Sequence, residues 1–475
     1  MLLWTMSGIV MMYKQYPEID PWESLALKEP INVTDCCQLP VSAIIREDDY
    51  SLVQLEMLNR EPVLRLHTLD RGIVSYDLLR GRAFDSIDQS KANTIADNFV
   101  QDRYAGSSIN DSYAIQNDQW TVYSSYNRHR PLFKFELNDD ERTEFYISSR
   151  TGGVVQLTTA DQRLWGYLGA VIHWLYPTLL RQHTAVWAQV VIWLSIVGIF
   201  LTVTGLYIGI RQYTKRNSGK LSPYQGIPLY HHYAGLIFGI LTLTWVTSGL
   251  LSMNPWGTLE GEGIAGEYQR MTERSLSWTE VEQVLTRLNP TTLDSDSVQV
   301  DISVMAGETS VIAYQANGDK ARLHPATLQS SPYSLAELEI LAQRLQPDAA
   351  ILSAQILDTE DSYYYVHHEQ RELPVYRVLI DDSQQRRYYL SPIDGQILLK
   401  VDEQSRLYRW LFYGIHRGDF SGLTRSRPFW DSFMLLLLLG VTVICGTGSY
   451  MGIKRLRRDL SSKRNLDVEA LDMSV

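Results

Sequence analysis

Three long apolar segments constrain the fold of this chain more than any other feature. They cover residues 185–210, 233–253 and 434–453. Each is about as long as the roughly 20-residue α-helix that crosses a bilayer, so we expect all three to span a membrane. The mean hydropathy of the whole chain, −0.16, conceals these segments because the intervening regions are polar. A further apolar stretch, residues 1–13, is too short to cross alone and lacks the features of a signal peptide.

Basic residues indicate how these segments are oriented. Lysine and arginine cluster in residues 211–220 and again in residues 454–464. By the positive-inside rule, both clusters face the cytoplasm. The two long polar regions then lie outside a bacterial inner membrane. They carry most of the acid behind the net charge of −11, which argues against nucleic acid as a partner.

The chain contains an internal repeat. The stretch "PLFKFELNDDERTEFYISSRTGGVV" aligns with "PVYRVLIDDSQQRRYYLSPIDGQIL" at an offset of 243 residues. At the same offset "RLWGYLGAVIH" aligns with "RLYRWLFYGIH" and "TGLYIGIR" with "TGSYMGIK", and at 241 "WTMSGIVMM" aligns with "WVTSGLLSM". So constant an offset indicates two copies of one unit, in which a helix enters, an outer domain follows and a helix returns.

The repeat predicts that the first membrane helix is incomplete in this sequence. Its missing part would precede Met1, so we expect the true start of the chain upstream, with counterparts of His231 and His232. The alternative is a short helix that enters the bilayer partway and leaves backbone groups unpaired in lipid. In the outer regions, apolar spacing predicts a helix over residues 333–345, and partial alternation predicts strands in both copies.

The expected fold class is therefore an α-helical membrane protein with a four-helix transmembrane core, a truncated first helix, two α+β extracytoplasmic domains and an internal duplication. In chain order we expect a partial transmembrane helix 1 (1–13), outer domain 1 (14–163), an interfacial helix with transmembrane helix 2 (164–211), a cytoplasmic loop (212–228), transmembrane helix 3 (229–253), outer domain 2 (254–405), an interfacial helix with transmembrane helix 4 (406–453), and a cytoplasmic tail (454–475).

Histidines at the membrane edges are the candidate site residues. His173 and His416 occupy the same repeat position before returning helices, so pseudo-twofold symmetry would let them face each other at the outer side. His231 and His232 stand at the inner side, since 18 residues to Gly249 span roughly 27 Å. Neutral imidazoles from separate helices can hold haem iron axially. The alternative is that these are interfacial side chains in an aromatic belt.

His183 is a further candidate. It lies just before the apolar segment 185–210, and its repeat counterpart is Ser426. It would replace His173 as a ligand if the bend at Tyr176 and Pro177 carried His173 away.

Two pairs of adjacent residues elsewhere, one of histidines and one of cysteines, have side chains that can bind metals, but we do not expect a metal site at either. His367 and His368 align with serines in the other copy, so the architecture does not require them. Cys36 and Cys37 form no CxxC motif, and we expect two ordinary thiols there, with a vicinal disulfide as the alternative.

The stretches "HHYAGLIFGILTLTWVTSGLLSMNP", "PVYRVLIDDSQQRRYYLSPIDGQIL" and "YRWLFYGIHRGDF" resemble the PepSY-associated transmembrane family of bacterial inner-membrane proteins. The resemblance covers nearly the whole chain and implies PepSY-like α+β outer domains. Some members are ferric-siderophore reductases with b-type haem on membrane-helix histidines. The resemblance therefore implies His231 as a ligand at the inner side and His173 and His416 at the outer side.

The first functional expectation is a haem-b-binding inner-membrane protein, with two haems, that passes electrons across the membrane to a ferric siderophore or another ferric chelate in the periplasm. No G-x-G-x-x-G fingerprint follows a strand, so the electron donor would be another molecule, cytoplasmic or in the membrane. The alternative is a non-enzymatic scaffold or regulator whose PepSY-like domains bind an envelope protein. A transporter is disfavoured because the apolar segments carry almost no charge.

Overall fold

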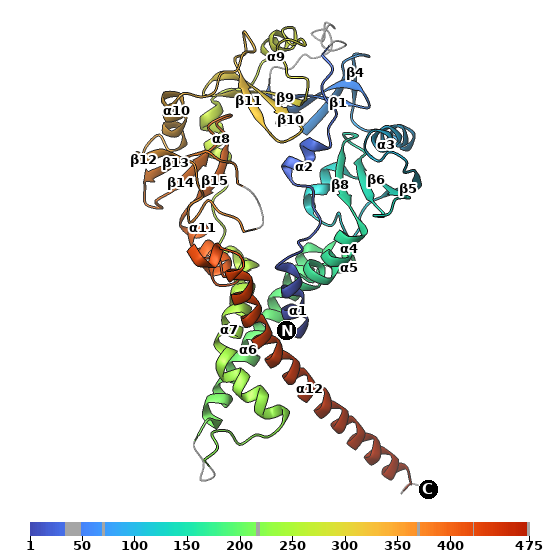
Figure 1. Ribbon diagram of the computed structural model, residues 1–475, viewed down its shortest axis with the longest axis vertical. Helices are drawn as coiled ribbons and strands as arrows, with labels where there is room; N and C mark the ends of the chain where they lie inside the picture. Colours follow the sequence, from blue (N-terminus) through green and yellow to red (C-terminus); the bar gives the residue numbers. More distant parts are fainter. Residues whose placement is uncertain (34–48, 69–71, 215–218, 368–370, 421, 473–475) are drawn as a thin grey trace. The chain divides into compact units, whose positions relative to one another are not determined.

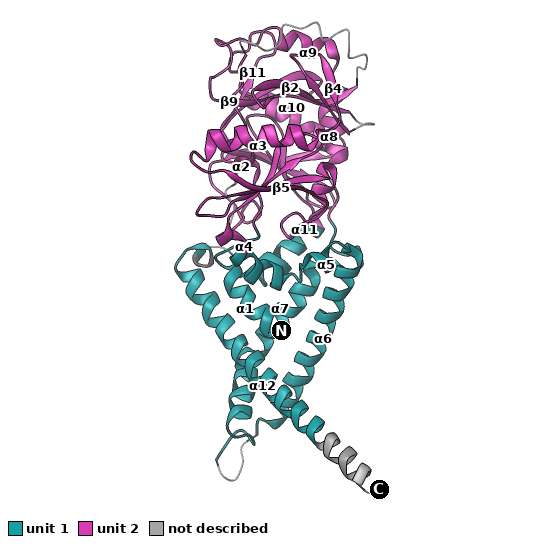
Figure 2. Ribbon diagram, turned by 90° about the vertical axis from the view of Figure 1, so that its right-hand side faces the viewer, with its two compact units in different colours: residues 1–16, 164–260, 404–475 teal, residues 17–163, 261–403 magenta. Residues whose placement is uncertain are grey.

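The computed structural model divides the chain into two compact units, coloured separately in Figure 2. The helical unit comprises residues 1–16, 164–260 and 404–475, and the sheet unit comprises residues 17–163 and 261–403. The structure describes residues 1–33, 49–68, 72–214, 219–367, 371–420 and 422–472. Cys36, Cys37 and His368 lie outside the described residues.

Among the described residues of the helical unit, three helices are long and apolar enough to cross a membrane. They are α6 (Thr184–Gln212), α7 (Ile227–Ser252) and the segment Phe429–Ser461 of α12 (Phe429–Asp472) (Figure 1). The expectation of three helices with the length and apolar composition of membrane spans is thereby confirmed. The first apolar stretch forms a shorter helix, α1 (Leu2–Met11), which packs against α12.

Glycines bring these helices into close contact. A Cβ atom at Gly239 of α7 would lie 2.6 Å from Leu206 of α6, and one at Gly440 of α12 would lie 2.5 Å from the ring of Phe238 of α7. Side chains at these two positions would push the helices apart. Small residues at such crossings are the usual means by which membrane helices pack closely.

Each histidine of the outer candidate pair follows a short helix that ends in a π-helical turn. The first run consists of α4 (Ala160–Gly166) and the turn η3 (Tyr167–Val171), and the second of α11 (Glu403–Tyr408) and the turn η5 (Arg409–Gly414). A further short helix, α5 (Thr178–Arg181), precedes α6. Single π-helical turns occur often at functional sites.

The sheet unit is built around one antiparallel sheet of seven strands. Strands β1 and β9 are central in it, and Leu55 lies opposite Val300. The two regions expected as separate outer domains therefore share a sheet. Its order is β11 (Lys320–Leu323), β10 (Glu308–Gln315), β9 (Ser297–Met305), β1 (Tyr50–Leu58), β2 (Glu61–Thr68), β3 (Gly72–Asp77) and β4 (Arg82–Phe84).

Two four-stranded antiparallel sheets complete this unit, each preceded by a helix. Helix α3 (Gln89–Arg103) precedes β5 (Ile109–Ile115), β6 (Leu132–Leu137), β7 (Glu144–Ser148) and β8 (Val154–Thr158). Helix α10 (Leu335–Leu345) precedes β12 (Ala350–Leu357), β13 (Val375–Asp381), β14 (Arg387–Leu390) and β15 (Ile397–Val401). Both sheets follow sequence order, and the predicted α+β character is confirmed.

Each sheet of the sheet unit has its own apolar core. The remaining helices are α2 (Pro21–Ala26), α8 (Ala265–Thr272) and α9 (Trp278–Leu285). Val281 of α9 packs with Leu55 and Val300 of the seven-stranded sheet, all three without exposed surface. Burial of such a side chain contributes on the order of 1.5–3 kcal/mol, so these cores supply much of the stability of the unit.

Candidate functional site

The structure brings His173 and His416 together in the helical unit. Their ring centroids are 6.2 Å apart, with the ring planes at 72°. The residues are 243 positions apart in the chain, and each follows its own π-helical turn. Two imidazoles from segments far apart in the sequence therefore lie next to each other.

Both rings are held through Nδ1 by a neighbouring helix. Nδ1 of His173 lies 3.0 Å from the carbonyl oxygen of Trp4 and 3.3 Å from the hydroxyl of Ser7, both in α1. Nδ1 of His416 lies 3.0 Å from the hydroxyl of Ser248 in α7. The same ring atom is therefore fixed in both histidines.

His231, near the start of α7, is held in the same way by α12. Its Nδ1 lies 3.0 Å from the hydroxyl of Thr447 and 3.2 Å from the carbonyl oxygen of Ile444. The carbonyl belongs to the residue three positions before the hydroxyl, as Trp4 does with Ser7. His231 and Ser248 are 17 residues apart on α7, which separates the two sites by about 26 Å along the helix.

A glycine follows each of these hydroxyl residues, and we call Ser7–Gly8, Ser248–Gly249 and Thr447–Gly448 the hydroxyl–glycine pairs. A Cβ atom on the glycine would lie 3.5, 3.5 and 3.2 Å, respectively, from Cε1 of the bound histidine. The missing side chain lets the ring approach the helix. Sequence reasoning did not assign these pairs, although two of them recur in the aligned "WTMSGIVMM" and "WVTSGLLSM".

The hydrogen-bond pattern favours one tautomer in all three rings: the carbonyl oxygens beside Nδ1 of His173 and His231 can only accept, and the hydroxyl beside His416 can accept as well. Each hydroxyl has one hydrogen, which a carbonyl oxygen of its own helix can accept: that of Leu3 at 2.6 Å, Trp245 at 3.0 Å and Val443 at 2.6 Å. Each hydroxyl then accepts from the histidine, so Nδ1 carries the proton. Nε2 of a neutral ring consequently carries a lone pair, the state that binds a metal.

His232 has a different environment, although it is adjacent to His231. Its Nδ1 lies 2.8 Å from the Ser222 hydroxyl, and its Nε2 lies 2.8 Å from the carbonyl oxygen of Gly209 in α6. The side chain is buried, and both ring nitrogens are engaged. This arrangement suits a residue that joins α7 to α6, and it favours His231 as the metal ligand of the two.

His183, the remaining candidate, caps the start of α6. The residue is exposed, and its ring makes no hydrogen bond to any residue in the described part of the chain. His173 keeps its place against α1 despite the bend at Tyr176, so His183 is not needed as its substitute.

An arginine lies beside the His173–His416 pair. Arg417 follows His416, and its guanidinium lies 5.4 Å from the ring centroid of Phe412 and 5.0 Å from that of Tyr413. The ring of Phe412 also stacks on His416, with centroids 5.2 Å apart. Arg417 has no acidic partner among the described residues. The site therefore offers one uncompensated positive charge.

These residues fit a haem iron better than a metal ion held by side chains alone. Metal–imidazole bonds are about 2 Å long, so one ion between two rings would place their centroids about 6 Å apart, close to the 6.2 Å observed. A T-shaped ring contact allows the same spacing. No cluster of three or more His, Cys, Asp or Glu ligands exists in the described segments. A porphyrin supplies four ligands itself and needs only two imidazoles.

Comparison with known proteins identifies the family. No curated protein matches the chain. The sequence profile of the family described as PepSY-associated TM region matches residues 1–455. This span includes both polar regions, helices α6 and α7, the part of α12 up to Arg455 and every histidine described above. The chain is therefore a membrane protein that belongs to the PepSY-associated TM region family.

Proposed function

We propose that this protein binds haem b in the membrane and passes electrons to a ferric siderophore or another ferric chelate. The observation that carries the proposal is the recurrence of the hydroxyl–glycine pair. Three imidazoles, His173, His416 and His231, are each held by Nδ1 with Nε2 left as a ligand atom. Histidines with a purely interfacial role would not require the same hydrogen-bond arrangement at three separate positions.

Two haem sites are proposed, at opposite ends of α7. His173 and His416 would be the axial ligands of one haem, and His231 a ligand of the other. Haem bound there would supply a one-electron redox centre at each site. The chain itself provides the axial ligands and the apolar helix surfaces around them. Arg417 provides a positive charge for the carboxylates that haem b carries.

The proposed architecture is a duplicated one. Helices α1, α6, α7 and α12 form a four-helix core of two repeated halves, each with a PepSY-like region on the outer side of a bacterial inner membrane. The positive charge of residues 454–464, in the C-terminal half of α12, supports a cytoplasmic position for that end. The ferric chelate would then be reduced in the periplasm.

The electron balance requires a second protein or a membrane reductant. Reduction of one ferric ion takes up one electron. The G-x-G-x-x-G match at residues 261–266 follows α7 and a short 3-10 turn, not a strand, so it is not the fingerprint of a nicotinamide or flavin site that could supply this electron. A reductant of the cytoplasm or the membrane would therefore act as the donor.

A visible spectrum of the purified full chain, loaded with haem, tests the proposal. A low-spin Soret spectrum is expected from the wild type. His173→Ala and His416→Ala should each lower the haem-to-protein ratio or convert the outer site to high spin. His324→Ala, an exposed histidine of the sheet unit, is the matched control and should leave the spectrum unchanged. A wild type without a Soret band would refute the proposal and leave a non-enzymatic scaffold that binds an envelope protein.

A further inference from the structure

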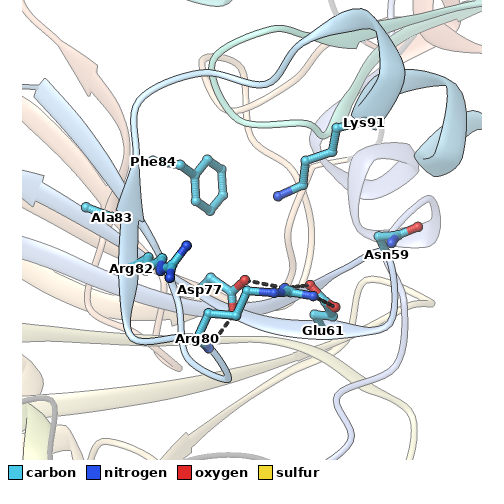
Figure 3. A pocket seen from close by; sticks show the side chains of 8 residues that line it. All are labelled: Asn59, Glu61, Asp77, Arg80, Arg82, Ala83, Phe84 and Lys91. Carbon is cyan, nitrogen blue, oxygen red and sulfur yellow. Dashed lines mark hydrogen bonds and ion pairs between the residues drawn. The ribbon is translucent and has the colours of Figure 1, made fainter.

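A pocket of about 370 Å³ opens in the sheet unit beside the edge strand β4 (Figure 3). It lies where the turn between β1 and β2, the end of β3 and the first turn of α3 meet. Basic, polar and aromatic side chains line it: Asn59, Glu61, Asp77, Arg80, Arg82, Ala83, Phe84 and Lys91. Figure 3 shows the side-chain ends of Lys91 and Arg82 and the ring of Phe84 around the same open space.

Two of the three cations that line this pocket form no ion pair with a described residue, and the charged lining residues together carry a net charge of +1. Arg80 is paired with Glu61 and with Asp77, so these three residues together carry a net charge of −1. Arg82 and Lys91 form no ion pair with any residue that the structure describes. Lys91 instead places its ammonium 4.6 Å from the ring centroid of Phe84.

A neutral donor completes the set. The side-chain oxygen of Asn59 accepts a hydrogen bond from Asn98 at 2.6 Å. The side-chain NH₂ group of Asn59 makes no hydrogen bond within the described chain, and it remains a donor on the pocket wall. Cation and amide donors thus converge, as recognition of an oxyanion requires.

The position of Lys91 in its helix is not explained by helix chemistry. Asp88 caps α3 by accepting from the backbone of Lys91 at 2.8 Å, so Lys91 is the third residue of the helix. In α10, the third residue is Glu337, which completes a capping box with Ser334. A cation in the first turn opposes the helix dipole, whereas glutamate there is favourable. The helix dipole therefore does not explain Lys91, whose ammonium lies over the ring of Phe84 in the pocket lining.

We propose that this pocket binds a compact oxyanion, a carboxylate or phosphate group of a small molecule. The guanidinium of Arg82 offers the planar fork that matches two oxygens of such a group, and Lys91 adds a point charge. Phe84 forms an apolar wall for the carbon skeleton. No histidine lines this pocket, so the anion-binding proposal does not depend on the proposal of haem binding.

Calorimetric titration of the purified full chain with two probes, citrate and inorganic phosphate, tests this site. The key variant is Lys91→Glu, which removes the cation and gives α3 the capping box that α10 already has. It should leave the melting temperature unchanged or raised while it weakens anion binding. Arg82→Gln tests the second cation. Arg287→Gln, an exposed arginine outside the pocket with no acidic partner in the described part of the chain, is the matched control.

Wild type should bind at least one probe, with an affinity that falls as sodium chloride is added. Each pocket variant should weaken that binding roughly tenfold or more, because a hydrogen bond to a charged group is lost. Binding of citrate alone would assign a carboxylate ligand, binding of phosphate alone would assign a phosphate ligand, and binding of both would assign a general oxyanion site. The proposal is overturned if neither probe binds, or if Lys91→Glu and Arg82→Gln bind as Arg287→Gln does.

Discussion

Replacing one hydroxyl, Ser248→Ala, should weaken haem binding at the His173–His416 site without unfolding α7. The hydroxyl of Ser248 lies 3.0 Å from Nδ1 of His416 and is its close partner. Without it, the ring loses a constraint on both its orientation and its tautomer, while the imidazole itself remains. The matched control is Ser252→Ala, one turn further along α7, whose hydroxyl donates to the Gly249 carbonyl oxygen at 2.7 Å and contacts no histidine in the described part of the chain.

The size of the effect follows from the hydrogen bond that is lost. One intramolecular hydrogen bond contributes about 0.5–1.5 kcal/mol, or roughly a factor of 2 to 13 in a binding constant. Partners that orient a metal-bound histidine typically change metal affinity about 10- to 100-fold. We therefore expect about a tenfold loss for Ser248→Ala. Ser7→Ala should cost less, because His173 keeps the 3.0 Å contact to the Trp4 carbonyl oxygen.

Haem titration of the purified variants, followed by the Soret band, measures these affinities. The expected order of dissociation constants is Ser248→Ala above Ser7→Ala, with Ser252→Ala equal to wild type. Equal affinity in Ser248→Ala and Ser252→Ala would show that the hydroxyl does not support a ligand. A larger loss in Ser7→Ala than in Ser248→Ala would contradict the geometric argument.

Three further predictions concern the glycines, a buried carboxyl and the topology. Gly448→Ala should perturb the proposed haem site at His231 more than Gly249→Ala perturbs the one at His416. The added Cβ would lie 3.2 Å from Cε1 of His231 but 3.5 Å from Cε1 of His416, and a difference spectrum of each variant against wild type measures the two effects. Burial raises the pKa of Asp301 to about 6, above the unfolded value of about 3.9, so wild-type stability is lost as pH rises from about 4 through 6. Asp301→Asn should therefore gain about 2–3 kcal/mol relative to wild type across that range in thermal melts, and a constant difference would contradict this. In a cysteine-free background and right-side-out vesicles, Ser125→Cys should be labelled from outside and Ser461→Cys protected; the reverse result would invert the topology.

The long apolar helices, helix α10 and the four strands β6, β7, β13 and β14 could be predicted because their signals are local. A run of apolar residues long enough to cross a bilayer specified α6, α7 and α12 without knowledge of their partners. Alternation in "LPVYRVLI" and "QRRYYLS" predicted β13 and β14 for the same reason. The aligned histidines were found through the repeat, and their proximity in space agrees with what the repeat suggested.

The central sheet could not be predicted, because its key pairing is not local. Strands β1 and β9 are joined along their edges although more than 240 residues separate Leu55 from Val300. No turn or short loop connects them, and nearly all residues of β9 are buried, so its alternation is weak. A sequence read in windows shows two outer regions and gives no sign that they share a sheet.

The hydroxyl–glycine pairs escaped sequence reasoning for a different reason. A serine or threonine before a glycine in an apolar helix has an ordinary explanation in helix packing. Its second role becomes visible only when the partner histidine is known, because Ser7 and His173 are 166 residues apart in the chain. The same sequence pattern occurs at Thr204 and Gly205 of α6.

Differences between the proposed repeats are more informative about ligand orientation than the similarities. His173 and His416 are held alike, so the pair by itself treats the two sides of a bound macrocycle alike. The residues that follow them differ: Trp174 follows the first and Arg417 the second. Since Arg417 has no acidic partner among the described residues, a ligand with carboxylates on one edge would be favoured in one orientation. Arg417→Gln should therefore keep both axial ligands and a low-spin spectrum, yet weaken haem binding and broaden the Soret band through mixed orientations. An unchanged affinity and band shape would show that this charge does not act on the bound group.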